Sequence, residues 1–155
     1  MHTSKETLAN HHQTLCHIFD GLISLKEFKR AYPFAVKLSD EYPINPERIP
    51  NFIRVSLATE EYQNLINFCK MIIELDDDLS AIRKPIAAAL AISAKNLVDE
   101  DADIDLVKEA SLKAIELTET GSGIFVTSVE NLYRIEYYKL SNKIQKQHTD
   151  EQWEA

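Results

Sequence analysis

Two short stretches, KEFKRA at residues 26–31 and EEYQNL at residues 60–65, decide how this chain is expected to fold. Their aromatic residues, Phe28 and Tyr62, lie 34 positions apart, and the same offset aligns further apolar positions on both sides. The aligned pairs are Ala31 with Leu65, Ala35 with Cys69, Leu38 with Ile72, Leu15 with Ile49, Ile18 with Phe52, and Phe19 with Ile53. A fixed period of this length is typical of helix–turn–helix repeats. The sequence therefore predicts two consecutive helical units.

Apolar spacing supports helices throughout the chain and gives no sustained alternation typical of strands. Between Leu65 and Ile73, apolar residues recur at the third, fourth, seventh and eighth positions, which places them on one helical face. With start and stop signals, this spacing predicts an all-α chain of about seven helices. Their expected ranges are 5–20, 25–41, 46–58, 60–75, 79–97, 105–119 and 123–147. Pro33 is expected to kink or break the second helix.

Local signals predict where several helices begin and end. Ser24 with Glu27 has the pattern of a capping box, and Thr59 precedes two acids that suit a helix start. Asp103 or Asp105 is expected to cap the sixth helix, and the segment 121–123, Gly-Ser-Gly, to allow the turn that follows it. We expect one helical-repeat domain over residues 1–148 and a polar C-terminal tail over residues 149–155.

The closing segments of the units carry a family resemblance. IELD at residues 73–76 and IELT at residues 115–118 resemble the end of a tetratricopeptide repeat, and the proline typical of that position is present once, at Pro43. The resemblance covers about residues 12–120, with about eight extra residues in the third unit and bulky Phe19 and Ile53 where the family has a small residue. It implies a TPR-like α-solenoid of antiparallel helix pairs with a long C-terminal capping helix. Another α-solenoid or a helical bundle is the alternative.

Composition limits the classes of function. The 155 residues include 17 basic and 25 acidic ones, a formal charge of −8, which disfavours nucleic acid as a partner. The N-terminal residues have no apolar signal-peptide core, and no apolar run approaches the length of a membrane span. We therefore expect a cytoplasmic protein without membrane insertion. Cys16 and Cys69 lie in helical, apolar contexts and are expected to be reduced core thiols.

Candidate sites for chemistry have simpler structural interpretations. His11, His12, Cys16 and His17 include a workable ligand pair but lack a second cluster of ligands. The acidic stretch 99–105 lacks the glycine and glutamate of a calcium loop, and the acids at 76–78 fall at a helix junction. The segment 121–123 lacks the lysine of a phosphate-binding loop. We predict no metal, no cofactor and no catalytic residue.

The resemblance implies a protein-binding function instead. In the resembled family, the first helix of each unit lines a concave groove that holds a segment of a partner protein. By position, the groove residues here are Cys16, Asp20, Ile23, Asn51, Arg54, Leu57, Lys84, Ala88 and Ala91. The chain is thus predicted to be an adaptor or a small chaperone-like protein. The alternatives are a structural homo-oligomer that stacks through its terminal repeats, which the aromatic last helix would support, and a metal-dependent enzyme.

Overall fold

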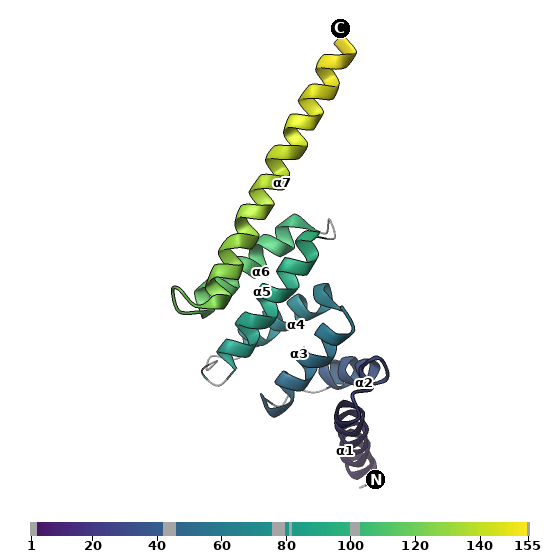
Figure 1. The fold of residues 1–155 in the computed structure, drawn as a ribbon. Helices are drawn as coiled ribbons and strands as arrows, with labels where there is room; N and C mark the ends of the chain where they lie inside the picture. The colour runs from purple at the N-terminus through teal and green to yellow at the C-terminus, as the bar shows by residue number, and fades with distance from the viewer. Residues whose placement is uncertain (1–2, 42–45, 76–79, 81, 100–102, 155) are drawn as a thin grey trace. The chain divides into compact units, whose positions relative to one another are not determined.

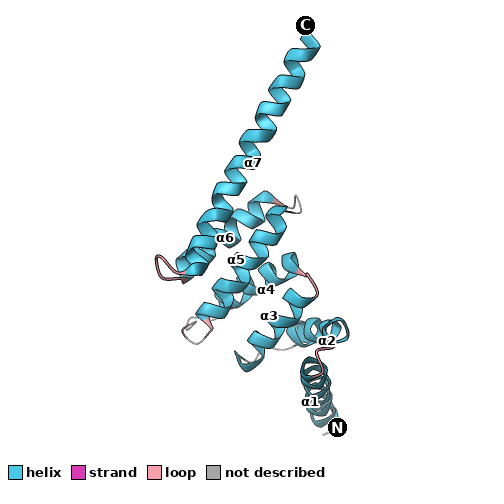
Figure 2. Ribbon diagram, in the orientation of Figure 1, coloured by secondary structure: helices cyan, strands magenta, loops and turns pink. Residues whose placement is uncertain are grey.

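The computed structural model of the chain describes residues 3–41, 46–75, 80, 82–99 and 103–154. Within these ranges the regular structure is entirely helical, with no strand, which confirms the predicted all-α class (Figures 1 and 2). The elements are α1 (Thr3–Ser24), α2 (Phe28–Glu41), the 3-10 helix η1 (Pro46–Arg48), α3 (Ile49–Ala58), α4 (Tyr62–Leu75), α5 (Arg83–Asp99), α6 (Ile104–Leu117) and α7 (Gly123–Glu154).

The contacts divide the chain into two compact units, Met1–Leu65 and Ile66–Ala155. The boundary falls inside α4, whereas the sequence prediction of a single domain over residues 1–148 placed no boundary there. In the first unit α2 packs against both α1 and α3. Apolar residues at helical spacing form its core, because each helix buries one face. The core residues are Leu15, Cys16, Phe19, Ile23, Ala31, Ala35, Leu38, Ile49, Phe52, Ile53, Val55 and Leu65.

The turns after α1 and α3 repeat the same geometry. Lys26 and Glu60 both adopt left-handed backbone, with φ of 58° and 60°. The next N–H in each turn donates to a carbonyl five residues earlier, Glu27 to Leu22 and Glu61 to Ser56, both over 2.9 Å. The N–H of each left-handed residue donates to a carbonyl three residues earlier, Lys26 to Ile23 over 3.0 Å and Glu60 to Leu57 over 3.2 Å, which completes a Schellman motif. The two turns are therefore equivalent at an offset of 34 residues.

These turns correct two predicted helix starts. Ser24 is the last residue of α1, so it does not cap α2, and Thr59 is the C-cap of α3 rather than the opening of α4. The Thr59 hydroxyl donates to the carbonyl of Val55 over 2.8 Å. A Ser or Thr next to acids suits either end of a helix, because its hydroxyl can also donate to the preceding turn. The left-handed residues decide between the two, and neither is a glycine.

Pro33 was expected to kink or break α2, and it does not break the helix. The helix continues from Phe28 to Glu41 with Pro33 inside it. Pro33 is exposed, as is Lys29, whose carbonyl would accept the N–H that proline lacks. Because that side of the helix faces solvent, water can replace the missing hydrogen bond. The cost is therefore small enough for the buried face of α2 to maintain the helix.

In the second unit α5 is the central helix and packs against both α6 and α7. It is buried on most sides and is rich in small residues, which allow neighbouring helices to approach closely. The buried residues of α5 are Ile86, Ala87, Ala89, Leu90, Ala91, Ser93, Ala94 and Leu97. The amide of Asn131 on α7 donates to the carbonyl of Ala91 over 3.1 Å, and Asn131 itself is buried. This bond fixes α7 against α5.

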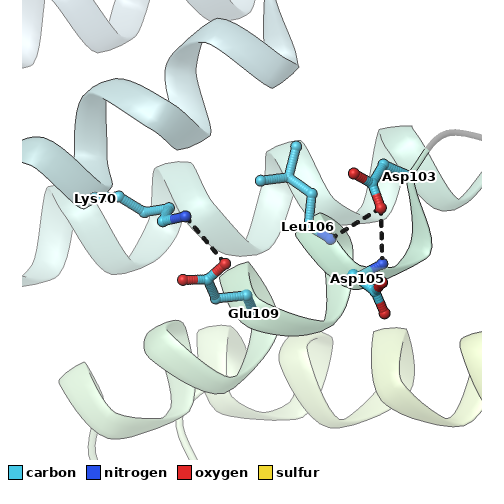
Figure 3. Close-up of polar contacts among 5 residues, drawn as sticks. All are labelled: Lys70, Asp103, Asp105, Leu106 and Glu109. Atoms are coloured by element: carbon cyan, nitrogen blue, oxygen red, sulfur yellow. Dashed lines mark hydrogen bonds and ion pairs between the residues drawn. The ribbon is translucent and has the colours of Figure 1, made fainter.

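Side chains at helix ends set where α6 and α7 begin. The Asp103 carboxylate accepts the N–H groups of Asp105 (3.1 Å) and Leu106 (3.5 Å), which confirms Asp103 as the cap of α6 (Figure 3). Gly121 supplies a left-handed φ of 89° in the following turn, and the Ser122 hydroxyl accepts the N–H of Phe125 over 3.2 Å. Helix α7 then continues to Glu154, beyond the helix end at residue 147 expected from the sequence.

Candidate partner-binding surface

The first unit contains a hollow of about 280 Å³ beside α1. Residues one turn apart on α1 line it, because helical spacing places them on the same face. Arg48 from η1 completes the lining. The lining residues are His12, Gln13, Cys16, His17, Asp20 and Arg48. Two of the predicted groove residues, Cys16 and Asp20, therefore lie in one hollow, together with two of the histidines considered as metal ligands.

Cys16 and His12 interact in this hollow. The Cys16 sulfur lies 3.5 Å from His12 Nε2, one helical turn away, and Cys16 is buried. His11 and His17 are exposed on other positions of the same helix. Within the part of the chain that the structure describes, no group of three or more His, Cys, Asp or Glu side chains could hold a metal ion. The Cys16–His12 contact is a hydrogen bond within one helix.

A weak ion pair forms the other side of the hollow. Arg48 Nη2 lies 3.6 Å from Asp20 Oδ2, and both side chains are partly exposed. Such a pair contributes less than about 1 kcal/mol to stability. Arg48 Nε is shielded from solvent and has no hydrogen-bond partner among the described residues. A shielded donor without an acceptor is costly. Arg48 is therefore suited to donate a hydrogen bond to an acceptor of a bound molecule.

The other predicted groove residues of the first unit differ in exposure. Ile23 is buried and belongs to the core, whereas Asn51 and Leu57 are partly exposed on α3. Arg54 is exposed, and its guanidinium carbon lies 5.1 Å from the centre of the Phe28 ring, a cation–π contact between α3 and α2. Of the α3 residues, Asn51, Arg54 and Leu57 thus remain accessible to a partner.

The predicted groove residues of the second unit lie along α5. Ala91 is buried, so its side chain is not an accessible surface, and Ala88 is partly exposed. Lys84 is exposed and lines a hollow of about 400 Å³ formed by helix ends. Its lining residues are Ser80, Arg83, Lys84, Leu117, Thr118, Glu119, Ser122 and Ile124. Lys84 therefore lines a hollow, whereas Ala91 lies in the core.

Sequence reasoning missed Arg48 and Gln13. The sequence predicts one helix over residues 46–58, which includes Arg48 and gives it no particular role. In the structure it ends the separate 3-10 helix η1, which brings it to α1. Arg48 follows Asp20 by 28 residues, an offset that differs from the repeat period. The proline and acid that precede Arg48 indicated only a helix start.

Burial raises the pKa of two groups. In the first unit, burial raises the pKa of Tyr32, the hydrogen bond from Asn64 over 3.1 Å opposes this, and Glu61 adds to it. In the second unit, burial raises the pKa of Cys69 to about 12. The Cys69 thiol therefore stays protonated at neutral pH and is a core residue rather than a nucleophile.

Comparison with known proteins gives no significant match. No family model matches the sequence, and no curated protein or solved structure matches it significantly. Among the described residues, no helix combines the length and apolar character needed to cross a membrane.

Proposed function

We propose that this protein is a protein-interaction module that binds a segment of a partner protein on the α1–α3 surface of its first unit. The observation that carries this proposal is Arg48, which lines the hollow and whose shielded Nε has no hydrogen-bond partner among the described residues. A partner that supplies a carboxylate or a main-chain carbonyl would satisfy this donor. Asp20, already beside Arg48, would hold the guanidinium in place.

The size and lining of the hollow favour an anchoring side chain over a metabolite. About 280 Å³ is at the lower edge of the range of small-molecule pockets, and suits one side chain of a larger partner. The partner would continue along α3, past Asn51, Arg54 and Leu57. Two equivalent turns at a 34-residue offset support a helical-repeat arrangement like that of the tetratricopeptide family. In that arrangement the chain would act as an adaptor or a small chaperone.

Co-purification from the native host tests the proposal. We expect a stoichiometric partner to be recovered with the wild-type chain and lost with Arg48→Gln, which shortens the donor and removes its charge. Arg30→Gln is the matched control, because Arg30 is exposed on α2 and does not line the hollow. Helicity measured by circular dichroism should be the same in all three proteins. Recovery of the wild-type chain alone, or equal recovery with Arg48→Gln, would contradict the proposal.

A further inference from the structure

Helix α7 carries an exposed apolar stripe in the second unit. Val126, Tyr133, Tyr137 and Ile144 retain 47%, 74%, 69% and 56% of their surface. Their spacings of seven, four and seven residues are those of core positions in a coiled coil. Position 140, which continues this pattern, is leucine in the sequence. Scattered exposed apolar residues are ordinary, but a run at this spacing indicates a surface for another helix.

The stripe is separate from the face that α7 uses inside its own unit. Ser128, Asn131 and Ile135 are buried, and α7 packs against α5 and α6. At 3.6 residues per turn, these three residues lie on the side of the helix opposite the stripe. Figure 1 shows α7 continuing past the ends of α5 and α6. A second helix can therefore lie along the stripe on the side away from α5 and α6.

One edge of the stripe carries an acid and a base. Glu136 directly precedes Tyr137, and Lys143 directly precedes Ile144, so both charges lie along the same edge. Both side chains are exposed, and seven residues, about 10.5 Å along the helix, is too far for an ion pair between them within α7. Glu136 lies 4.0 Å from Lys139, at the limit of an ion pair. A partner that presents a base to Glu136 and an acid to Lys143 would complement this edge.

We propose that two copies of this chain form a symmetric dimer in which their α7 stripes pack together antiparallel. A two-fold axis brings the same edge of the two helices together, so each contact occurs twice. Glu136 of each copy then faces Lys143 of the second copy. The edge of α7 is therefore its own complement. The stripe belongs to the second unit and the hollow beside α1 to the first, so either proposal can fail without the other.

The register that pairs these charges also pairs the apolar positions. Tyr133 packs against Ile144 of the second copy, and Tyr137 packs against position 140. Glu130, the acid within the stripe, is exposed and faces the exposed Gln147 of the second copy. The Gln147 amide can donate a hydrogen bond to the Glu130 carboxylate. The positions from 130 to 147 therefore meet compatible positions along the whole contact.

The other charges of α7 favour the antiparallel order. In a parallel pair, the two Glu130 carboxylates would lie at the same level of the interface and repel each other. In the antiparallel pair they lie at opposite ends of the contact. Arg134 lies along the other edge of the stripe, and Lys139 and Lys146 lie on the far side of the helix. None of these bases therefore meets its own copy across the interface.

Sedimentation velocity of the full chain at about 100 μM, well above a micromolar dissociation constant, tests the dimer. We expect a dimer for the wild type and a monomer for Tyr133→Ser combined with Ile144→Ser, which removes apolar contacts. Leu112→Ser, an exposed apolar residue on α6, is the matched control and should remain a dimer. Helicity by circular dichroism should be the same in all three proteins. A monomeric wild type, or a dimer of the double variant, would overturn the proposal.

Charge reversal tests the antiparallel order. Glu136→Lys and Lys143→Glu should each weaken the dimer about tenfold, because each places like charges at both edge contacts. Mixing the two variants should restore the dimer as a heterodimer, since each copy then meets the opposite charge at both contacts. Lys146→Glu, on the far side of the helix, is the matched control and should leave the dissociation constant unchanged. If the mixture forms no more dimer than either variant alone, the antiparallel pairing is wrong.

Discussion

Lys26 and Glu60 occupy the same position in two turns 34 residues apart, each with left-handed backbone and each followed by the same bond back to the preceding helix. Left-handed backbone costs a residue with a Cβ roughly 1–2 kcal/mol, and glycine avoids that cost. The chain accepts this cost twice, at equivalent places. The turn between α1 and α2 and the turn between α3 and α4 therefore have the same backbone geometry, although their residues differ.

Glycine at either position should stabilise the protein. Both side chains are exposed, so Lys26→Gly or Glu60→Gly removes backbone strain without a loss of packing. We expect each variant to raise the free energy of unfolding by up to about 1 kcal/mol, with additive effects because the turns are separate. Urea denaturation followed by circular dichroism measures this. Lys37→Gly, in the middle of α2, should instead destabilise by about 1 kcal/mol. If glycine destabilised the protein at all three positions, Lys26 and Glu60 would not be at helix ends where glycine is favoured.

Asn131 should be sensitive to small changes. It is 1% exposed, and its amide donates to the carbonyl of Ala91. Asn131→Ala removes this bond and leaves a cavity, so we expect a loss of about 1–3 kcal/mol in unfolding free energy. Asn131→Asp, nearly the same size, should cost more at neutral pH because it places a carboxylate against a carbonyl in the core. If Asn131→Asp unfolds at the same denaturant concentration as the wild type, the hydrogen bond from Asn131 to Ala91 does not contribute to stability.

Cys69 should make stability depend on alkaline pH. Burial raises its pKa from 9.0 to about 12 in the folded chain, which favours the neutral thiol over the thiolate. Its contribution is fully present below about pH 9 and is lost as pH rises toward 12, at up to about 1.4 kcal/mol per pH unit. When the pH is raised from about 8 to about 10.5, the free energy of unfolding should therefore fall less for Cys69→Ala than for the wild type. Identical losses in urea denaturation would show that the thiol ionises freely.

Asp103 should anchor the start of α6. Its carboxylate accepts two N–H groups that the helix cannot satisfy internally. Asp103→Ala is expected to cost about 1 kcal/mol, while Asp103→Asn should retain most of the stability. Asp105→Ala is the control, because Asp105 lies in the first turn but supplies no side-chain cap. Hydrogen exchange of the Asp105 and Leu106 amides would show the loss locally. Unchanged exchange in Asp103→Ala would contradict this role.

The helices could be predicted from the sequence because burial imposes a period. Leu65, Phe68, Cys69 and Ile72 recur on one face of α4, and all four are buried. Helix ends were harder to predict because local signals are ambiguous. Ser24 and Thr59 resemble helix starts, but the left-handed Lys26 and Glu60 make them helix ends, and no glycine marks either turn. Pro33 is tolerated because it is exposed, a property that depends on packing rather than on its neighbours in the sequence.

The candidate surface could be predicted only in part. The family resemblance named Cys16 and Asp20 together by position, and both line the hollow beside α1, since residues one turn apart share a face. It could not distinguish Asp20 at the rim from Ile23 in the core, because that depends on where α2 packs. Arg48 could not be predicted because η1 interrupts the expected helix, and its approach to Asp20 has no periodic signal. The aromatic residues of α7 could be seen in the sequence. Which side of this helix is buried could be decided only from the structure, in which Ile135 is buried.

The packing within each unit joins helices that are close in the sequence. Helix α2 packs on α1 and α3, and α5, α6 and α7 pack on one another. Little chain entropy is lost in closing such short loops, so proteins with mostly local contacts fold within microseconds to milliseconds. Each unit should therefore fold rapidly, and its helices should begin to pair while the rest of the chain is still being synthesised. A nascent chain of this kind exposes its apolar faces only briefly, which reduces its exposure to aggregation.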